Sequence, residues 1–207
     1  MDAPEQPQLY LITPPVFDPM VFAPDLARVL DGADIACLRL TLASADEDTV
    51  ARAADALREV THARDIAIVV SDHVLLAERL GLDGVHLSDA GRSVRAARKT
   101  LGADAIVGSY CAASDHDGMV AGEAGVDYVS FGPVGGAALG DGTLAPVDLF
   151  QWWSQMIELP VVAEGGLTPD LVAQLAPVTD FFGIGPEIWD HDDPLAALNT
   201  LIAPMAG

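Results

Sequence analysis

Two glycine-rich segments near the carboxyl end of the chain have residue types that could bind a phosphate. Each follows a short apolar run that reads as a strand. Glycine lets an anion approach the backbone closely, and backbone N–H groups or a threonine hydroxyl at a helix start can donate hydrogen bonds to it. The alternative is a pair of plain tight turns, because turns use glycine for their own geometry. The candidate phosphate-binding residues are Gly165, Gly166, Thr168, Ile184 and Gly185.

Two neighbours of the second segment oppose a phosphate there. Pro186 has no backbone N–H to donate. Glu187 places an acidic group close to where a dianion would lie. Both residues therefore favour the alternative of plain turns.

Arg39 is a candidate for binding a negatively charged group. Side chains alternate along a strand, so Cys37, Arg39 and Thr41 share one face while Leu38 and Leu40 share the other. The leucines suit a face covered by helices, which directs Arg39 to the opposite side. A buried guanidinium needs an anionic partner. That partner is either a ligand phosphate or, within the protein, Asp72 or Glu164.

Three more polar side chains follow strand-like runs. His86 and Glu164 are candidates for acid/base catalysis, with a purely structural role as the alternative for His86. Asp72 could bind Mg²⁺ through its carboxylate, or it could cap the helix that follows it. The candidate catalytic residues are thus Arg39, His86 and Glu164, and the candidate metal ligand is Asp72.

Strand-like and helix-like segments alternate along the chain with almost no spare sequence, and they position these candidates. Short, nearly all-apolar strands indicate a parallel sheet that helices cover on both faces. The expected strands are residues 8–13, 35–41, 66–70, 84–87, 105–108, 127–131, 160–163 and 180–184. The expected helices begin near Asp18-Pro19 and then cover residues 45–62, 73–80, 93–101, 114–124, 146–157, 168–175 and 194–201.

Eight such units in 207 residues predict a closed barrel. We expect a single (β/α)8 TIM barrel, an α/β fold, as one domain over residues 1–207, with residues 1–7 as a flexible N-terminal tail. An open sheet would usually carry a Gly-x-Gly-x-x-Gly turn after the first strand, and Thr13-Pro14-Pro15 has no such pattern. Catalytic groups of a barrel lie at the carboxyl ends of its strands, where the candidates above are found.

Composition restricts the partners. Ten basic residues against 31 acidic ones give a net charge of −21, which argues against nucleic acid and anionic membranes as partners. The amino end lacks the basic and apolar stretches of a signal peptide, so a cytoplasmic location is expected. Cys37 and Cys111 lack the spacing of metal ligands, and we expect them to be reduced and to act as small apolar residues. The sequence leaves the oligomeric state open, with a homo-oligomer among the options.

Four segments that run in order through nearly the whole chain carry a family resemblance. They are residues 9–13, 82–87, 123–133 and 160–168, and the third contains Asp-Tyr-Val-Ser-Phe-Gly-Pro. Together they resemble the thiamine phosphate synthase/TenI family. The resemblance implies a (β/α)8 barrel that joins hydroxymethylpyrimidine diphosphate to thiazole phosphate, releasing pyrophosphate with Mg²⁺. The expected partner is therefore a small phosphorylated thiazole or pyrimidine ligand.

Matched to the family's motifs, the two halves of the expected site differ. Of the family's Gln-x-Arg-x-Lys only Arg39 remains, and its Thr-x-Thr-Lys falls on residues 137–140, which contain neither threonine nor lysine. Asp72 matches one metal-binding aspartate, whereas the second falls at Gly91. The thiazole-phosphate glycines Gly165, Gly166 and Gly185 are retained. Since one strong donor to developing charge contributes roughly 2.7–4 kcal/mol, efficient release of pyrophosphate is unexpected.

Three functional hypotheses follow. The first is a divergent thiamine phosphate synthase in which Arg39 and a Mg²⁺ on Asp72 handle the leaving group, with weak or lost activity. The second is a TenI-like thiazole phosphate tautomerase with His86 or Glu164 as its base. The third is a non-catalytic barrel that binds a phosphorylated ligand. Whether the loop at residues 135–142 closes as a lid stays open.

Overall fold

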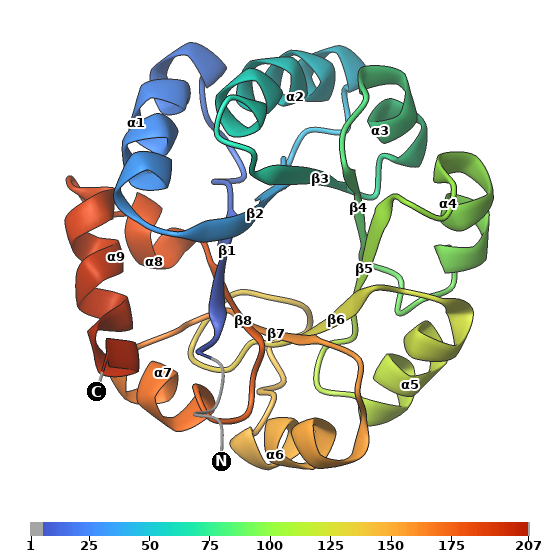
Figure 1. The fold of residues 1–207 in the computed structure, drawn as a ribbon, viewed down its shortest axis with the longest axis vertical. Coiled ribbons are helices and arrows are strands. Elements are labelled where there is room, and N and C mark those ends of the chain that lie inside the picture. Colours follow the sequence, from blue (N-terminus) through green and yellow to red (C-terminus); the bar gives the residue numbers. More distant parts are fainter. Residues whose placement is uncertain (1–5, 207) are drawn as a thin grey trace.

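The computed structural model describes residues 6–206, and its centre is a closed barrel of eight parallel strands (Figure 1). Each strand pairs with its sequence neighbour, and β1 closes the ring by pairing with β8, Leu11 opposite Ile184. This confirms the predicted (β/α)8 barrel. The strands are β1 (Gln8–Ile12), β2 (Ile35–Leu40), β3 (Ala67–Ser71), β4 (Gly84–Leu87), β5 (Ile106–Tyr110), β6 (Tyr128–Phe131), β7 (Val161–Glu164) and β8 (Phe181–Ile184).

Helices form a ring around the barrel (Figure 1). Side chains cap the first turns of some of them: the Asp18 carboxylate accepts the N–H of Met20, and the Thr168 hydroxyl accepts that of Leu171. The helices are α1 (Pro19–Gly32), α2 (Glu47–His62), α3 (Val74–Leu80), α4 (Val94–Leu101), α5 (Asp115–Ala124), α6 (Val147–Met156), α7 (Pro169–Leu175), α8 (Pro186–Trp189) and α9 (Pro194–Ile202), followed by a 3-10 helix, Ala203–Ala206.

Two element boundaries differ from the sequence prediction in ways that concern the site. The short helix α8 directly follows β8, where only a turn was expected. Its proline stands at the first helical position, where the missing N–H costs nothing. In addition, β5 continues to Tyr110 instead of ending at Gly108. The chain therefore places a helix, with Glu187 on it, at the mouth of the barrel.

The strands divide the buried side chains into two layers. Leu38 and Leu40 pack in the large apolar cluster between strands and helices, whereas Cys37 packs with Tyr10 and Tyr128 inside the barrel. This confirms the predicted faces of β2 and sends Arg39 to the interior. Alternation along each strand therefore decides which residues can meet at the barrel centre.

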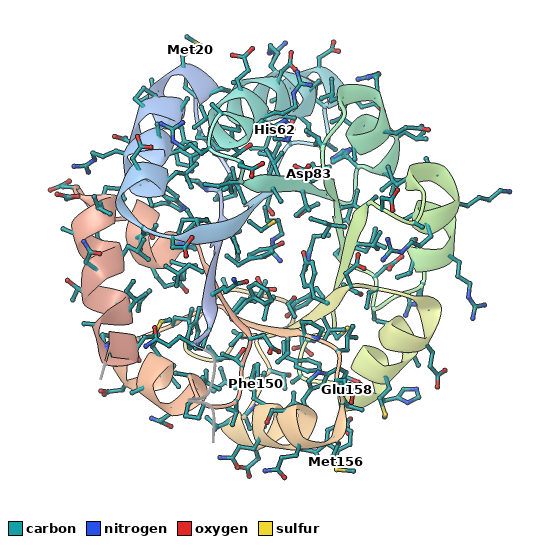
Figure 2. All side chains as sticks on the ribbon, in the orientation of Figure 1. Met20, His62, Asp83, Phe150, Met156 and Glu158 are labelled. Carbon is teal, nitrogen blue, oxygen red and sulfur yellow. The ribbon has the colours of Figure 1, made fainter. Side chains whose placement is uncertain are left out.

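The outer surface and the chain ends add little to the site. Figure 2 shows Met20 and Met156 at the rim of the molecule, where they are exposed, and Phe150 on the inner side of α6, where it is fully buried. Among residues 6–206, no helix has the length and apolar character needed to cross a membrane. The flexible tail predicted for residues 1–7 lies largely outside the described residues and stays a prediction; Gln6, which is described, donates a hydrogen bond to the carbonyl of Met205.

Candidate functional site

A cavity of about 570 Å³ opens at the carboxyl ends of the strands, which is within the size range of small-molecule sites. Residues from both ends of the chain line it, because β1 and β8 are neighbours in the barrel. Its charged lining consists of one cation and three acidic residues. The lining is Ile12, Thr13, Pro15, Arg39, Thr41, Gly136, Ala137, Ala138, Leu139, Glu164, Gly165, Gly166, Gly183, Gly185, Pro186, Glu187 and Asp190.

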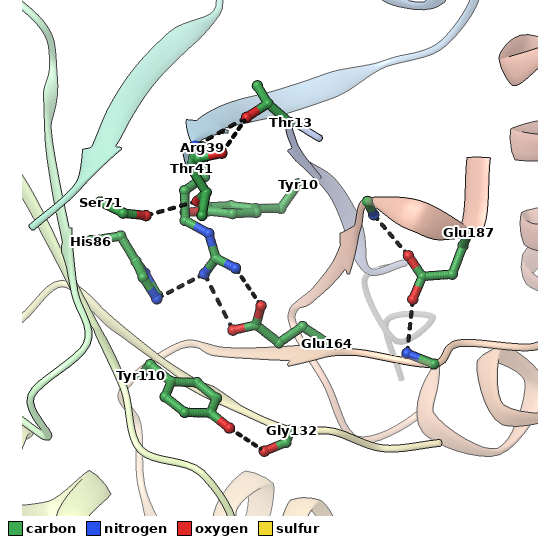
Figure 3. A network of polar contacts seen from close by, with 12 residues as sticks. Tyr10, Thr13, Arg39, Thr41, Ser71, His86, Tyr110, Gly132, Glu164 and Glu187 are labelled. Carbon is green, nitrogen blue, oxygen red and sulfur yellow. Dashed lines mark hydrogen bonds and ion pairs between the residues drawn. The ribbon is translucent and has the colours of Figure 1, made fainter. Parts of the chain in front are cut away.

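The guanidinium of Arg39 forms a buried ion pair with Glu164 across the barrel (Figure 3). Nη1 of Arg39 donates to Oε1 of Glu164 over 3.2 Å, and Nη2 donates to Oε2. Burial alone would lower the pKa of Arg39, but the Glu164 carboxylate outweighs it and raises the pKa. Of the partners considered for Arg39, the structure therefore brings Glu164 to it, and Asp72 lies elsewhere.

His86 extends this pair into a polar chain inside the barrel. Nη1 of Arg39 lies 2.7 Å from Nε2 of His86, and Nδ1 of His86 lies 2.9 Å from the hydroxyl of Tyr128. A second tyrosine, Tyr10, shares a 2.6 Å hydrogen bond with Tyr128. A guanidinium can only donate, so Nε2 must accept and the proton of His86 lies on Nδ1. Burial, together with the Arg39 charge, lowers the pKa of His86 and keeps it neutral.

The carboxylate of Glu187, on α8, accepts hydrogen bonds from backbone N–H groups at the cavity wall. Its Oε1 accepts the N–H of Gly166 at 2.8 Å and that of Leu167 at 3.2 Å, and its Oε2 accepts the N–H of Gly185 at 2.8 Å. Figure 3 shows Glu187 with one such contact drawn from each of its two oxygens. The two glycine segments predicted to bind a phosphate thus converge in space, as expected. The anion that meets them in the structure is the protein's own carboxylate.

The remaining predicted phosphate-binding residues divide between the cavity and its surroundings. Gly165 and Gly166 line it with positive φ angles of 83° and 75°, and Gly185 faces it from the end of β8. Ile184 is fully buried in β8 and is not part of the lining. Thr168 is exposed and caps α7, beside a different surface hollow that also includes His191 and Asp193. The structure thus separates Thr168 and Ile184 from the other three.

Asp72 directly follows β3 with a φ of 61° and is not part of the cavity lining. Its Oδ1 accepts the N–H of Ser88 and its Oδ2 the Ser88 hydroxyl, so the carboxylate ties the loops after β3 and β4 together. The predicted alternative, a cap on the following helix, is wrong, because His73 occupies the cap position. Within residues 6–206, no group of three or more His, Cys, Asp or Glu side chains is arranged to hold a metal. Asp72 alone therefore fits only a Mg²⁺ whose other ligands are substrate oxygens and water.

Sequence reasoning missed the role of Tyr10 and left the loop at residues 135–142 open. Tyr10 could have been found, because alternation in β1 places Leu9 and Leu11 on the helix side and Tyr10 inside. Residues 136–139 of the loop line the cavity, but they carry no polar side chain from which the sequence could have predicted this. Tyr110 lies beneath the same loop and donates to the carbonyl of Gly132 at 2.7 Å; burial, with help from Glu164, raises its pKa to about 12.

Comparison with known proteins gives consistent matches. The family described as thiamine monophosphate synthase matches residues 9–180. A thiamine-phosphate synthase of Rhodospirillum centenum is 43% identical over 97% of this chain and 98% of its own length, and one of Erythrobacter litoralis is 39% identical over 91% of each. The fold is similar to that of thiamine phosphate pyrophosphorylase from Pyrococcus furiosus, with a TM-score of 0.82 over 96% and 95% of the two chains at 21% identity.

Proposed function

We propose that this chain, which belongs to the thiamine monophosphate synthase family, joins hydroxymethylpyrimidine diphosphate to thiazole phosphate with release of pyrophosphate. The observation that carries the proposal is similarity to thiamine-phosphate synthases over almost the full length of both chains. The cavity supports it, since it lies at the carboxyl ends of the strands and joins a buried arginine to converging backbone N–H groups.

In this reaction the protein contributes position and charge instead of a nucleophile. The cavity holds both substrates at the barrel mouth, and Arg39 is the cation of its lining that can face the departing pyrophosphate. Because Glu164 already compensates the charge of Arg39, the chain itself offers the leaving group little net positive charge. We therefore propose a slow synthase.

The proposed metal is Mg²⁺, with Asp72 as its ligand from the chain. When bound, the ion would compensate the charge of the pyrophosphate. Asp72 would have to share its oxygens with Ser88 or release them. Replacing Asp72 by asparagine is expected to raise the Mg²⁺ concentration that gives half-maximal turnover, measured by titrating Mg²⁺ at saturating substrate; an unchanged Mg²⁺ requirement would remove this assignment.

The direct test is formation of thiamine phosphate from the two substrates with Mg²⁺, followed by chromatography and by release of pyrophosphate. We expect product from the native chain and none from Arg39→Ala. Arg28→Ala is the matched control, since Arg28 forms an exposed ion pair with Asp193 on the outer surface and should retain activity. Absence of product from the native chain would contradict the proposed synthase, and full activity of Arg39→Ala would exclude Arg39 from the leaving-group site.

The tautomerase hypothesis is less well supported by the geometry. It needs a free base in the cavity, but both oxygens of Glu164 accept hydrogen bonds from Arg39. Both ring nitrogens of His86 are also engaged, and the residue is only 3% exposed.

Calorimetry with thiazole phosphate alone distinguishes the synthase from the non-catalytic barrel. Binding of thiazole phosphate by a chain that shows no turnover would favour the non-catalytic barrel. The cytoplasmic location and a homo-oligomeric state also stay predictions.

A further inference from the structure

We propose that Glu187 competes with the phosphate of the ligand for the same backbone N–H groups and must leave them before that phosphate can bind. The inference rests on the proposed function, because it takes this cavity as the place where a phosphorylated ligand binds. It goes beyond that function by assigning to one residue control over access to the anion site. Glu187 already binds these converging donors, and the cavity around them carries net negative charge.

The backbone donors converge on a single anion position. The N–H groups of Gly166, Leu167 and Gly185 come from two separate loops, and the two oxygens of Glu187 span them at 2.8, 3.2 and 2.8 Å. A carboxylate in this position presents two anionic oxygens to three donors, which is the arrangement a phosphate would adopt on the same donors. Each donor has one hydrogen to give, so carboxylate and phosphate cannot both bind all three.

Negative charge in the cavity opposes an incoming phosphate. If Glu187 stayed in place, an arriving phosphate would meet like charge within hydrogen-bonding distance of the same donors. Asp190 and Glu164 add further negative charge to the lining, and the guanidinium of Arg39 is engaged with Glu164. A dianion therefore gains little attraction from the cavity until Glu187 turns away. Since Glu187 is partly exposed, water is available to solvate its carboxylate once it leaves.

The backbone that supplies the donors is held in place by packing between loops. Gly166 holds a positive φ of 75°, and a Cβ added there would lie 2.6 Å from the carbonyl carbon of Gly135. The N–H of Gly166 is thus held in place by a close approach of two loops. Removing the Glu187 side chain should leave the donors where they are, ready for another anion.

The experiment measures binding of inorganic phosphate by calorimetry, at constant ionic strength, to four full-length proteins. They are the native chain, Glu187→Ala, Glu187→Gln and Asp190→Asn. Hydrogen bonds to charged groups are strong enough that freeing three donors should tighten phosphate binding about tenfold to a hundredfold in Glu187→Ala. Asp190→Asn removes the same charge from the same cavity without freeing a donor, so its affinity should stay within about threefold of the native chain.

A second measurement covers the case in which Glu187→Ala is too unstable for calorimetry. In the native chain, amide hydrogen exchange at Gly166 and Gly185 should be slow; in Glu187→Gln it should be faster and should slow again when phosphate is added. Phosphate affinity in both Glu187 variants no higher than in Asp190→Asn would overturn the inference. That result is independent of turnover: a synthase with unchanged phosphate affinity refutes only this inference, and a tightened site without turnover refutes only the proposed function.

Discussion

The ion pair between Arg39 and Glu164 joins two side chains that are only 7% and 2% exposed. Removing one member leaves the other as an uncompensated charge inside the barrel. We expect Glu164→Gln to lower the free energy of unfolding by about 3–5 kcal/mol, measured by urea denaturation followed by circular dichroism.

The double variant Arg39→Met/Glu164→Gln is the control for this prediction. It removes both charges and should recover part of the loss, because no isolated guanidinium remains. A Glu164→Gln protein within about 1 kcal/mol of the native chain would contradict the prediction, since surface substitutions commonly cost that little.

The neutral state of His86 makes stability depend on pH. In the unfolded chain a histidine takes up a proton near its ordinary pKa of 6.5, whereas burial and Arg39 lower the pKa in the folded chain. The unfolded state therefore binds more protons below pH 6.5, and stability falls as the pH is lowered from there toward the folded-state pKa. The expected slope is up to about 1.4 kcal/mol per pH unit from this residue.

The measurement compares urea unfolding between pH 7.5 and 5 for the native chain, His86→Gln and His116→Gln. His86→Gln should show a shallower loss of stability toward low pH than the native chain. His116 is exposed on α5, so His116→Gln should follow the native chain. Equal slopes for the native chain and His86→Gln would show that His86 takes up its proton in the folded protein.

At the scale of elements, the site depends on how two loops approach each other. The loop after β7 meets the loop after β6 at Gly166 and Gly135, and the N–H of Gly135 donates to the carbonyl of Gly165 at 2.9 Å. Gly166→Ala should therefore destabilise the protein through both a positive φ and a steric clash, by more than about 1 kcal/mol in thermal or urea unfolding.

Gly81→Ala is the matched control for that substitution. Gly81 closes α3 with a φ of 63°, and a Cβ there would meet nothing within 4 Å. Its cost should come from backbone strain alone, about 1 kcal/mol. If the two variants lose equal free energy of unfolding, the close contact between the loops adds nothing to the cost of Gly166→Ala.

The elements also show where sequence reasoning succeeds and where it stops. Alternation in β2 predicted that Arg39 points inward, because it depends only on residues two apart in one strand. The engagement of Glu187 with Gly166 depends on how closely two loops approach, and no pattern along the chain reports that distance. The contacts between Asp72 and Ser88 could not be predicted either. They join the ends of β3 and β4, and they depend on a left-handed backbone conformation at Asp72 that the sequence does not reveal.

For the whole molecule, the dominant property is a net charge of −21. Mutual repulsion of the acidic residues opposes the compact state, and salt shortens the range of that repulsion to about 10 Å at 0.1 M. We expect the melting temperature to rise as NaCl is increased from 20 to 500 mM, on the order of a few degrees, by differential scanning calorimetry.

Potassium chloride is the control for that prediction, because screening does not distinguish Na⁺ from K⁺ and both salts should act equally. A melting temperature that stays constant or falls with salt would mean that exposed ion pairs, such as Arg64 with Asp31, contribute more than the repulsion costs.

A single side-chain hydrogen bond links Trp189, next to the last strand, to the first strand of the barrel. The indole N–H of Trp189, the last residue of α8, donates to the carbonyl of Ile12 at 2.7 Å, so the helix that carries Glu187 is anchored to β1. Departure of the Glu187 carboxylate is then a matter of side-chain torsions on a stationary helix. Exposed side chains rotate in picoseconds to nanoseconds, so the breaking of three hydrogen bonds, and not a microsecond-to-millisecond hinge movement, is expected to set the rate of this step.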